Sequence, residues 1–209
     1  FNGLWTQVSS NLSIYKSYPR LVGETGGKNF IFVHPSANIN DVCINTIRGA
    51  FEYQGQKCSA ASRMYVPRSL WPELKKCLCN LAQEITLGDV TDTGNFMNAV
   101  IDEKAFDNIK SYIDYSKESP DATIIAGGQC DKSTGYFIRP TIVETTNPRF
   151  KLMEEEIFGP VLCIYVYQDE KITEALDLCD TTSPYGLTGA VFSTDRVAAA
   201  AICERLRYA

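Results

Sequence analysis

The chain has 209 residues, of which 44% are hydrophobic and 22% charged, and its formal net charge is -5. This is the composition of a globular protein with enough apolar residues to bury a core. The negative charge offers no basis for binding nucleic acid or an anionic membrane, and no apolar run approaches the roughly 20 residues of a membrane span. Because the chain begins at Phe1 rather than at a methionine, we expect it to be a piece of a longer protein.

Helical and strand patterns alternate along the chain. In chain order the first half predicts a helix over 2–15, strands over 20–22 and 30–33, a helix over 40–53, a strand over 63–66 and a helix capped by Ser69. The second half predicts a helix over 102–117, strands over 123–126 and 161–166, a helix over 169–180, a strand over 187–193 and a helix from Asp195 to the C-terminus. This alternation predicts an α/β fold, with a mostly parallel twisted sheet and helices on both faces.

The cysteines are scattered and form no CxxC pair, lying at Cys43, Cys58, Cys77, Cys79, Cys130, Cys163, Cys179 and Cys203. This pattern does not resemble the disulfide framework of a small secreted domain, so free thiols in a reducing compartment are predicted. Cys77 and Cys79 are expected to point to different faces of one helix, and Cys163 to be a small buried residue in an apolar strand. With a single histidine, His34, no metal site is predicted.

A glycine-flanked carboxylate precedes the strand expected at 30–33, in the run Gly23-Glu24-Thr25-Gly26-Gly27-Lys28. A phosphate-binding loop would need glycine in place of Val22 and serine or threonine in place of Asn29, so that interpretation fails. The glycines are instead expected to let the backbone turn sharply after the strand at 20–22 and to present Glu24 from the end of that strand. A solvated glutamate in a β-turn is the alternative.

The candidate nucleophile is Cys58, which follows the helix over 40–53 and a break at Gly55. A thiol and a carboxylate suit covalent catalysis, in which the thiolate attacks a carbonyl and the carboxylate later activates water. A buried, inert thiol is the alternative, and Lys57 beside it is interpreted as surface charge. His34 offers the rival chemistry of a cysteine hydrolase, but it stands at a strand end without a motif of its own and is interpreted as a surface residue.

A third motif is the run Glu154-Glu155-Glu156-Ile157-Phe158-Gly159-Pro160, in which three acidic residues lead through a Gly-Pro turn into the strand over 161–166. In a functional interpretation Glu156 accepts hydrogen bonds from ribose hydroxyls, and Phe158 forms a flat wall against a ring. The alternative is a charged loop before a strand, with Phe158 in the core.

Together, the order and spacing of the three motifs resemble the aldehyde dehydrogenase superfamily, whose members carry E-x-G-G-K, then G-Q-x-C, then E-E-I-F-G-P before a strand. The resemblance spans most of the chain. It implies that Cys58 is the nucleophile, that Glu24 is the base for the hydrolytic water, and that NAD is the cofactor. It also implies that Glu156 holds the nicotinamide ribose and that Phe158 packs beside the ring. Thr25 replaces the leucine that is usual in the first motif.

Finer features are similar to one branch of this superfamily, in the runs Phe51-Glu52-Tyr53, Lys57-Cys58-Ser59-Ala60, Gly135-Tyr136-Phe137 and Tyr185-Gly186-Leu187-Thr188-Gly189-Ala190-Val191-Phe192. The branch implies a small-molecule aldehyde substrate, with Ser59 hydrogen-bonded to the substrate carboxylate. It also implies a location in the mitochondrial matrix, a homo-oligomeric parent protein, and no nucleic-acid or membrane partner.

The resemblance divides the chain into residues 1–24, the tail of a cofactor-binding domain, and residues 25–209, a C-terminally incomplete catalytic domain. In the family an asparagine that binds the oxyanion lies upstream, and a glycine-rich loop that holds the substrate carboxylate lies downstream. The 209-residue chain alone is therefore expected not to turn over. A non-catalytic scaffold or interaction module that retains the fold, and a dehydrogenase of a different aldehyde, are the competing interpretations.

Overall fold

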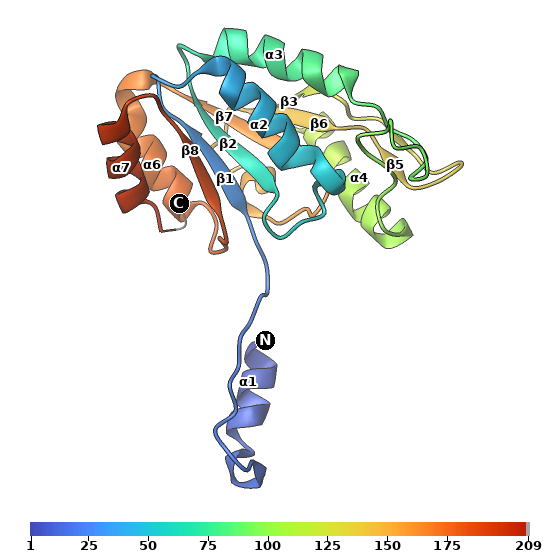
Figure 1. Ribbon diagram of the computed structural model, residues 1–209, viewed down its shortest axis with the longest axis vertical. Coiled ribbons are helices and arrows are strands. Elements are labelled where there is room, and N and C mark those ends of the chain that lie inside the picture. Colours follow the sequence, from blue (N-terminus) through green and yellow to red (C-terminus); the bar gives the residue numbers. More distant parts are fainter. Residues whose placement is uncertain (208–209) are drawn as a thin grey trace.

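The computed structural model describes residues 1–207 and contains a six-stranded sheet in the spatial order β3-β6-β7-β2-β1-β8 (Figure 1). The strands of this sheet are β1 (Asn29–Val33), β2 (Ala61–Pro67), β3 (Ala122–Ala126), β6 (Thr141–Thr145), β7 (Val161–Tyr167) and β8 (Gly189–Phe192). Neighbouring strands are parallel except for β3, which runs antiparallel to β6. A separate two-stranded ribbon pairs β4 (Cys130–Asp131) with β5 (Phe137–Ile138). The predicted fold class is confirmed.

Helices cover both faces of the sheet (Figure 1). One face is covered by α2 (Ile39–Phe51) and α3 (Trp71–Glu84), and the other by α4 (Glu103–Glu118), α6 (Ile172–Thr181) and α7 (Arg196–Arg205). The short helical segments are α5 (Lys151–Glu154) and the 3-10 turns Leu12–Ile14, Glu52–Gly55 and Asp169–Lys171. Helix α1 (Asn2–Ser9) lies away from the sheet and buries none of its residues (Figure 1). None of the helices among residues 1–207 is long and apolar enough to cross a membrane.

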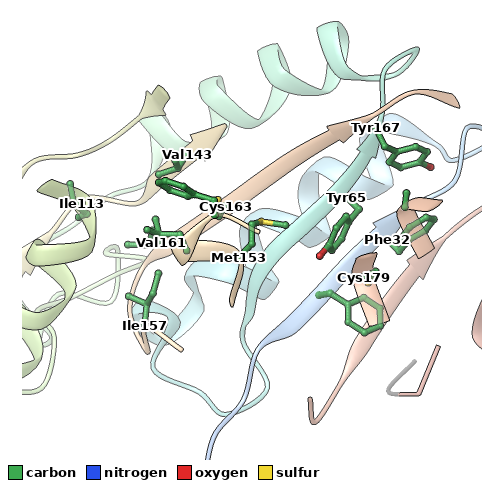
Figure 2. Packing of buried hydrophobic residues seen from close by; sticks show 14 of the residues in the cluster. Phe32, Tyr65, Ile113, Val143, Met153, Ile157, Val161, Cys163, Tyr167 and Cys179 are labelled. Atoms are coloured by element: carbon green, nitrogen blue, oxygen red, sulfur yellow. The ribbon is translucent and has the colours of Figure 1, made fainter. Parts of the chain in front are cut away.

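The core has two layers because successive residues of a buried strand point to opposite faces of the sheet. Phe32 and Tyr65 pack on the side of α6, where the Phe32 ring stacks on Tyr65 and on Tyr167 at centroid distances of 6.2 and 5.5 Å (Figure 2). Their neighbours Ile31 and Met64 face α2 and α3. The central strands are therefore held rigidly from both sides, which fixes the positions of the loops at their ends.

Several elements differ from the sequence-based expectation. The helix over 2–15 ends at Ser9, and no strand forms over 20–22, where the chain is extended and unpaired. Strands β4, β5 and β6 were not predicted. Ser69 does not cap α3, because its hydroxyl and its backbone N–H both donate to Asp169. Asp195 does cap α7, which ends at Arg205; the predicted continuation to residues 208–209 lies outside the described part of the chain.

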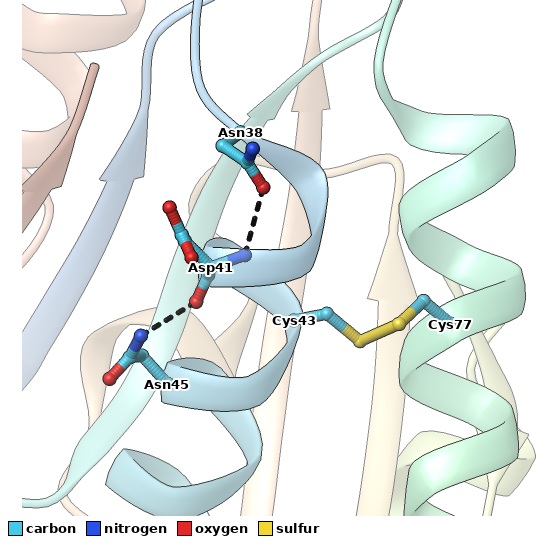
Figure 3. The surroundings of a disulfide bond; sticks show 5 residues. All are labelled: Asn38, Asp41, Cys43, Asn45 and Cys77. Atoms are coloured by element: carbon cyan, nitrogen blue, oxygen red, sulfur yellow. Dashed lines mark hydrogen bonds between the residues drawn. A yellow bond between two sulfur atoms is a disulfide. The ribbon is translucent and has the colours of Figure 1, made fainter. Parts of the chain in front are cut away.

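The prediction that all eight cysteines are free is wrong for two of them. Cys43 of α2 and Cys77 of α3 form a disulfide across the packed helices (Figure 3). Their spacing carries no signal, since only the packing of α2 on α3 brings the two Cα atoms to 6.3 Å, within bonding geometry. Cys77 and Cys79 point in different directions, as predicted: Cys77 is bonded to Cys43, whereas the thiol of Cys79 donates to the carbonyl of Ile125. The other six cysteines are free.

Candidate active site

Glu24 belongs to an extended segment that leads into β1, and its side chain is exposed. The sharp turn predicted at Gly23–Gly27 is absent, and none of its three glycines has a positive φ. Instead, two of these glycines allow the backbone to lie close to neighbouring loops. A Cβ on Gly26 would lie 3.3 Å from the ring of Tyr185, and one on Gly27 would lie 3.0 Å from the carbonyl oxygen of Cys58. The segment that carries Glu24 is thus pressed against two other loops.

Cys58 lies in a turn that begins β2, closed by a hydrogen bond from the Ala60 N–H to the carbonyl of Lys57. Its thiol is exposed, so the alternative of a buried thiol is wrong. Lys57 is bound to Glu52, with its Nζ 2.7 Å from the carboxylate, and this hydrogen bond lowers the pKa of Glu52. Lys57 therefore pairs away from Cys58, as its interpretation as surface charge implied.

Left-handed backbone at non-glycine residues is found in the two loops that carry Cys58 and Glu156. In the described chain the non-glycine residues with positive φ are Tyr53, Gln54 and Phe158. They are joined by Gly55, where a Cβ would lie 2.4 Å from the carbonyl oxygen of Gly159. Such conformations cost free energy and persist where the surrounding structure holds them, often at functional sites. Here they lock the two loops against each other.

Glu156 and Phe158 precede β7. The Gly27 N–H donates to Oε1 of Glu156 at 2.8 Å, which fixes the carboxylate beside the Glu24 segment. The Phe158 side chain is 46% exposed, so the alternative that it belongs to the core is wrong. A fixed carboxylate and an accessible flat ring could hold a ligand that carries hydroxyls next to a planar group.

One cleft of about 450 Å³ brings these side chains together. It is lined by Gly23, Glu24, Thr25, Gly26, Cys58, Glu156, Phe158, Pro184, Tyr185, Gly186 and Leu187. Ser59 is exposed but does not line this cleft; its carbonyl accepts a hydrogen bond from Thr188. Residues 184–187 form a wall of the cleft to which the sequence analysis gave no role, although Tyr185 opened a run that it had singled out.

A buried amine lies directly behind the cleft. Lys28 follows Gly27 and is fully buried, and its Nζ has no hydrogen-bond partner among the described residues. Burial lowers the pKa of Lys28 to about 7; the charge of Arg63 acts in the same direction, whereas Glu156 opposes it. The amine therefore loses most of its charge just above neutral pH.

The position of His34 contradicts the alternative of a cysteine hydrolase in which His34 activates Cys58. His34 follows the carboxyl end of β1, whereas Cys58 precedes β2, which runs parallel to β1. The two residues therefore lie at opposite ends of the sheet. The Nδ1 atom of His34 is instead 2.9 Å from the hydroxyl of Ser36, which also contacts Ser193. No group of three or more His, Cys, Asp or Glu side chains in residues 1–207 is arranged to hold a metal ion.

The chain belongs to the aldehyde dehydrogenase family, whose sequence profile matches residues 6–209. It is 54% identical over 200 residues to the mitochondrial delta-1-pyrroline-5-carboxylate dehydrogenase of Dictyostelium discoideum and 54% identical over 197 residues to that of Homo sapiens. These alignments cover 95% and 94% of the chain but only 36% and 35% of the relatives. The chain thus spans about a third of the length of the curated relatives that it matches.

Solved structures show the same relationship. The delta-pyrroline-5-carboxylate dehydrogenase of Mycobacterium tuberculosis superimposes with a TM-score of 0.89 and 44% identity over 99% of the chain and 37% of that protein. The same enzyme has been crystallised with NAD. Betaine aldehyde dehydrogenase of Staphylococcus aureus superimposes with a TM-score of 0.82 and 32% identity, over 88% of the chain and 37% of that protein. The architecture is therefore shared by enzymes named for different aldehydes.

Proposed function

We propose that the chain serves the NAD-dependent oxidation of L-glutamate 5-semialdehyde, the open form of Δ1-pyrroline-5-carboxylate, to L-glutamate in proline breakdown. The observation that carries the proposal is the meeting of Cys58, Glu24, Glu156 and Phe158 in one cleft. The names of the relatives support the choice of substrate. We also propose a homo-oligomeric protein located in the mitochondrial matrix, in keeping with the mitochondrial relatives.

The proposed reaction begins at Cys58. Its thiolate attacks the aldehyde carbon and forms a thiohemiacetal, whose oxyanion is placed to accept a hydrogen bond from the backbone N–H of Cys58. The exposure of the thiol gives the aldehyde access from the cleft. Oxidation of the same carbon leaves a thioester on Cys58.

Glu24 completes the reaction as a general base. Its carboxylate removes a proton from water, the water oxygen attacks the thioester carbon, and the carbon–sulfur bond breaks to release the carboxylic acid and the Cys58 thiolate. Glu24 is exposed and lines the same cleft, so water reaches it directly. Ser59 is proposed to bind the carboxylate at the far end of the substrate, although it lies just outside the lining of the cleft.

The residues of the cleft fit the nicotinamide ribose part of NAD. Glu156 offers carboxylate oxygens to two neighbouring hydroxyls while Gly27 holds it in place, and Phe158 offers a half-exposed ring beside them. Bound NAD would supply the oxidation by accepting a hydride. The assignment of residues 1–24 to the tail of a cofactor-binding domain and of residues 25–209 to the catalytic domain stays a prediction.

The experiment that tests the proposal supplies the intact protein with NAD and glutamate semialdehyde, and in parallel with betaine aldehyde. We expect NADH and glutamate in equal amounts, together with slower turnover of betaine aldehyde, which carries a cation in place of a carboxylate. Faster turnover of betaine aldehyde would refute the substrate. If no NADH forms and Cys58 also fails to react stoichiometrically with an electrophile, the protein is a non-catalytic scaffold. That residues 1–209 alone do not turn over stays a separate prediction.

A further inference from the structure

Asn29 is the first residue of β1 and is 3% exposed, two positions after Gly27. A side-chain amide can donate two hydrogen bonds through its NH2 group and accept two through its oxygen. The amide of Asn29 makes all four of these hydrogen bonds. The amide lies between the turn that carries Cys58 and the loop of residues 184–188, so one side chain ties together two loops that are distant in sequence.

The donor side of the amide holds the nucleophile turn. Its Nδ2 donates to the carbonyl of Cys58 at 2.5 Å and to the carbonyl of Ala60 at 3.0 Å. These carbonyls precede β2, which begins at Ala61. Their hydrogen bonds fix the Cys58–Ser59 and Ala60–Ala61 peptide groups, and with them the direction in which the Cys58 backbone faces the cleft.

The acceptor side of the amide holds the opposite wall. Its Oδ1 accepts the backbone N–H groups of Thr188 at 2.9 Å and of Leu187 at 3.3 Å. Leu187 lines the cleft, and the same loop places Tyr185 against Gly26. Because β8, β1 and β2 are neighbours in the sheet, an amide at the start of the middle strand lies between the loops on either side.

The geometry points to Asn29 as a positioning residue for the reaction proposed above: it sets the Cys58 turn at a fixed distance from the wall formed by residues 184–187. An aspartate of the same shape could accept from the wall but would turn a carboxylate oxygen toward the carbonyls of Cys58 and Ala60. A leucine could bond to neither loop. Only a side chain with both donors and acceptors satisfies both loops at once.

The test uses Asn29→Asp, which breaks the donor side alone, with Asn45→Asp as the matched control. Asn45 is exposed on α2, and its Nδ2 also donates to a backbone carbonyl, that of Asp41. Alkylation by iodoacetamide is followed by peptide mass spectrometry at Cys58 and, in the same molecules, at the exposed Cys203 of α7. The rate at Cys58 divided by the rate at Cys203 is insensitive to global differences between preparations.

We expect Asn29→Asp to lower this ratio about tenfold, because the carboxylate disfavours a thiolate and displaces the turn. Asn45→Asp should leave the ratio unchanged. In the intact protein, kcat should fall by about 10²-fold while KM for the aldehyde stays within about threefold, because the wall is still held. Asn29→Leu, which frees both loops, should raise KM as well.

The inference would be overturned if Asn29→Asp and Asn45→Asp gave the same ratio of alkylation rates at Cys58 and Cys203. It would also be overturned if Asn29→Asp lowered kcat and thermal stability but left this ratio unchanged. If Asn29→Asp does not fold, Asn29→Ser is measured in the same way, since its hydroxyl is too short to bridge both loops. The alkylation assay needs no dehydrogenase activity. A wild-type protein that forms no NADH would therefore refute the proposed function while the role of Asn29 is still decided.

Discussion

The two ends of the parallel strands carry different kinds of side chain. At the amino ends, Glu24 precedes β1, Cys58 precedes β2, Glu156 precedes β7 and Tyr185 precedes β8, and all four line one cleft. At the carboxyl ends, where open parallel sheets ordinarily bind their ligands, the polar groups bond to one another. His34 and Ser193 there share the hydroxyl of Ser36.

A second cleft, at the carboxyl ends of β6 and β7, sharpens the contrast. Its volume is about 320 Å³, and its lining includes Glu144, Lys171 and Glu174. Glu144 is paired with Lys75 at 2.6 Å, and Lys171 with Glu174 at 3.3 Å. Three of the four charged side chains that line this cleft are therefore already paired, and the fourth is Arg68. In the first cleft Glu24 and Cys58 are exposed, and we propose that these accessible side chains mark the amino ends of the strands as the functional end of this sheet.

The largest effect is expected at the amino end, from Cys58→Ala in the intact protein. NADH formation with glutamate semialdehyde should be abolished, because no covalent adduct can form. The matched control is Cys203→Ala, which removes the other exposed thiol, on α7. Cys203→Ala should retain wild-type turnover, measured by NADH absorbance. Turnover that survives in Cys58→Ala would contradict the assignment of Cys58 as the nucleophile, and its loss in Cys203→Ala instead would assign that role to Cys203.

Glu24→Gln should have the next largest effect. Steady-state turnover is expected to fall by ~10²–10⁴-fold for lack of a base to activate water. Attack by Cys58 and oxidation should still occur, so a pre-steady-state burst of up to one NADH per active site should survive in stopped-flow measurements. Glu73→Gln, on the exposed side of α3, is the control. Loss of the burst with NAD binding intact would show that Glu24 acts before the oxidation.

Cys43→Ser is expected to lower the free energy of unfolding without changing the turnover of the folded protein. Cys43 lies near the start of α2, which follows the carboxyl end of β1, and loss of its disulfide should lower the free energy of unfolding by ~2–4 kcal/mol. Turnover per folded molecule should not change. Urea denaturation with and without reductant measures the effect, and reductant should weaken the wild type but not the variant. Cys79→Ser, on α3 two residues after Cys77, is the control, and an equal loss there would contradict the prediction.

Lys28 should give a smaller, pH-dependent effect on stability at the amino end. The pKa of its amine is lowered by burial from 10.5 to about 7, so between these values the unfolded chain binds a proton that the folded chain does not. This group therefore makes stability rise with pH above about 7, whereas below that pH its contribution is constant. The slope is at most about 1.4 kcal/mol per pH unit.

Lys28→Met removes this contribution and should be more stable than the wild type near pH 7, with an advantage that shrinks as the pH rises. Urea denaturation over this range measures the difference, and Lys76→Met, at an exposed position of α3, serves as the control. An advantage that does not depend on pH would show that the amine keeps its proton in the folded chain.

His34→Ala should have the smallest effect, since it acts at the carboxyl end. Turnover is expected to stay within about twofold of the wild type, as for most substitutions away from a site. Any loss of stability should be modest, because the side-chain hydrogen bonds that change are those between His34 Nδ1 and the serines Ser36 and Ser193. Abolished turnover with the fold intact would support the alternative of a cysteine hydrolase that uses His34. It would also contradict the assignment of the site to the amino ends of the strands.

The sequence predicted the elements that are periodic or continuously apolar, such as β7 and α4, because the spacing of their apolar residues directly reflects which side chains are buried. It missed β6, and it placed a strand over 20–22 where extended backbone has no partner, because pairing depends on contacts distant in sequence. For the candidate site, the sequence predicted four residues that line one cleft, Cys58, Glu24, Glu156 and Phe158, together with Ser59, which does not line it. The role of Asn29 and the disulfide of Cys43 stayed hidden, since each depends on which loops or helices become neighbours in space.

The Cys43–Cys77 disulfide also closes a covalent ring in the chain. The ring contains Cys58 and all of β2, while the partners of β2 in the sheet, β1 and β7, lie outside it, on either side in sequence. A peptide bond cut anywhere between residues 44 and 76 would therefore leave the molecule in one piece. After such a single cut, the fragment that bears Cys58 would stay joined to the other fragment through the disulfide, and only reduction would separate the two.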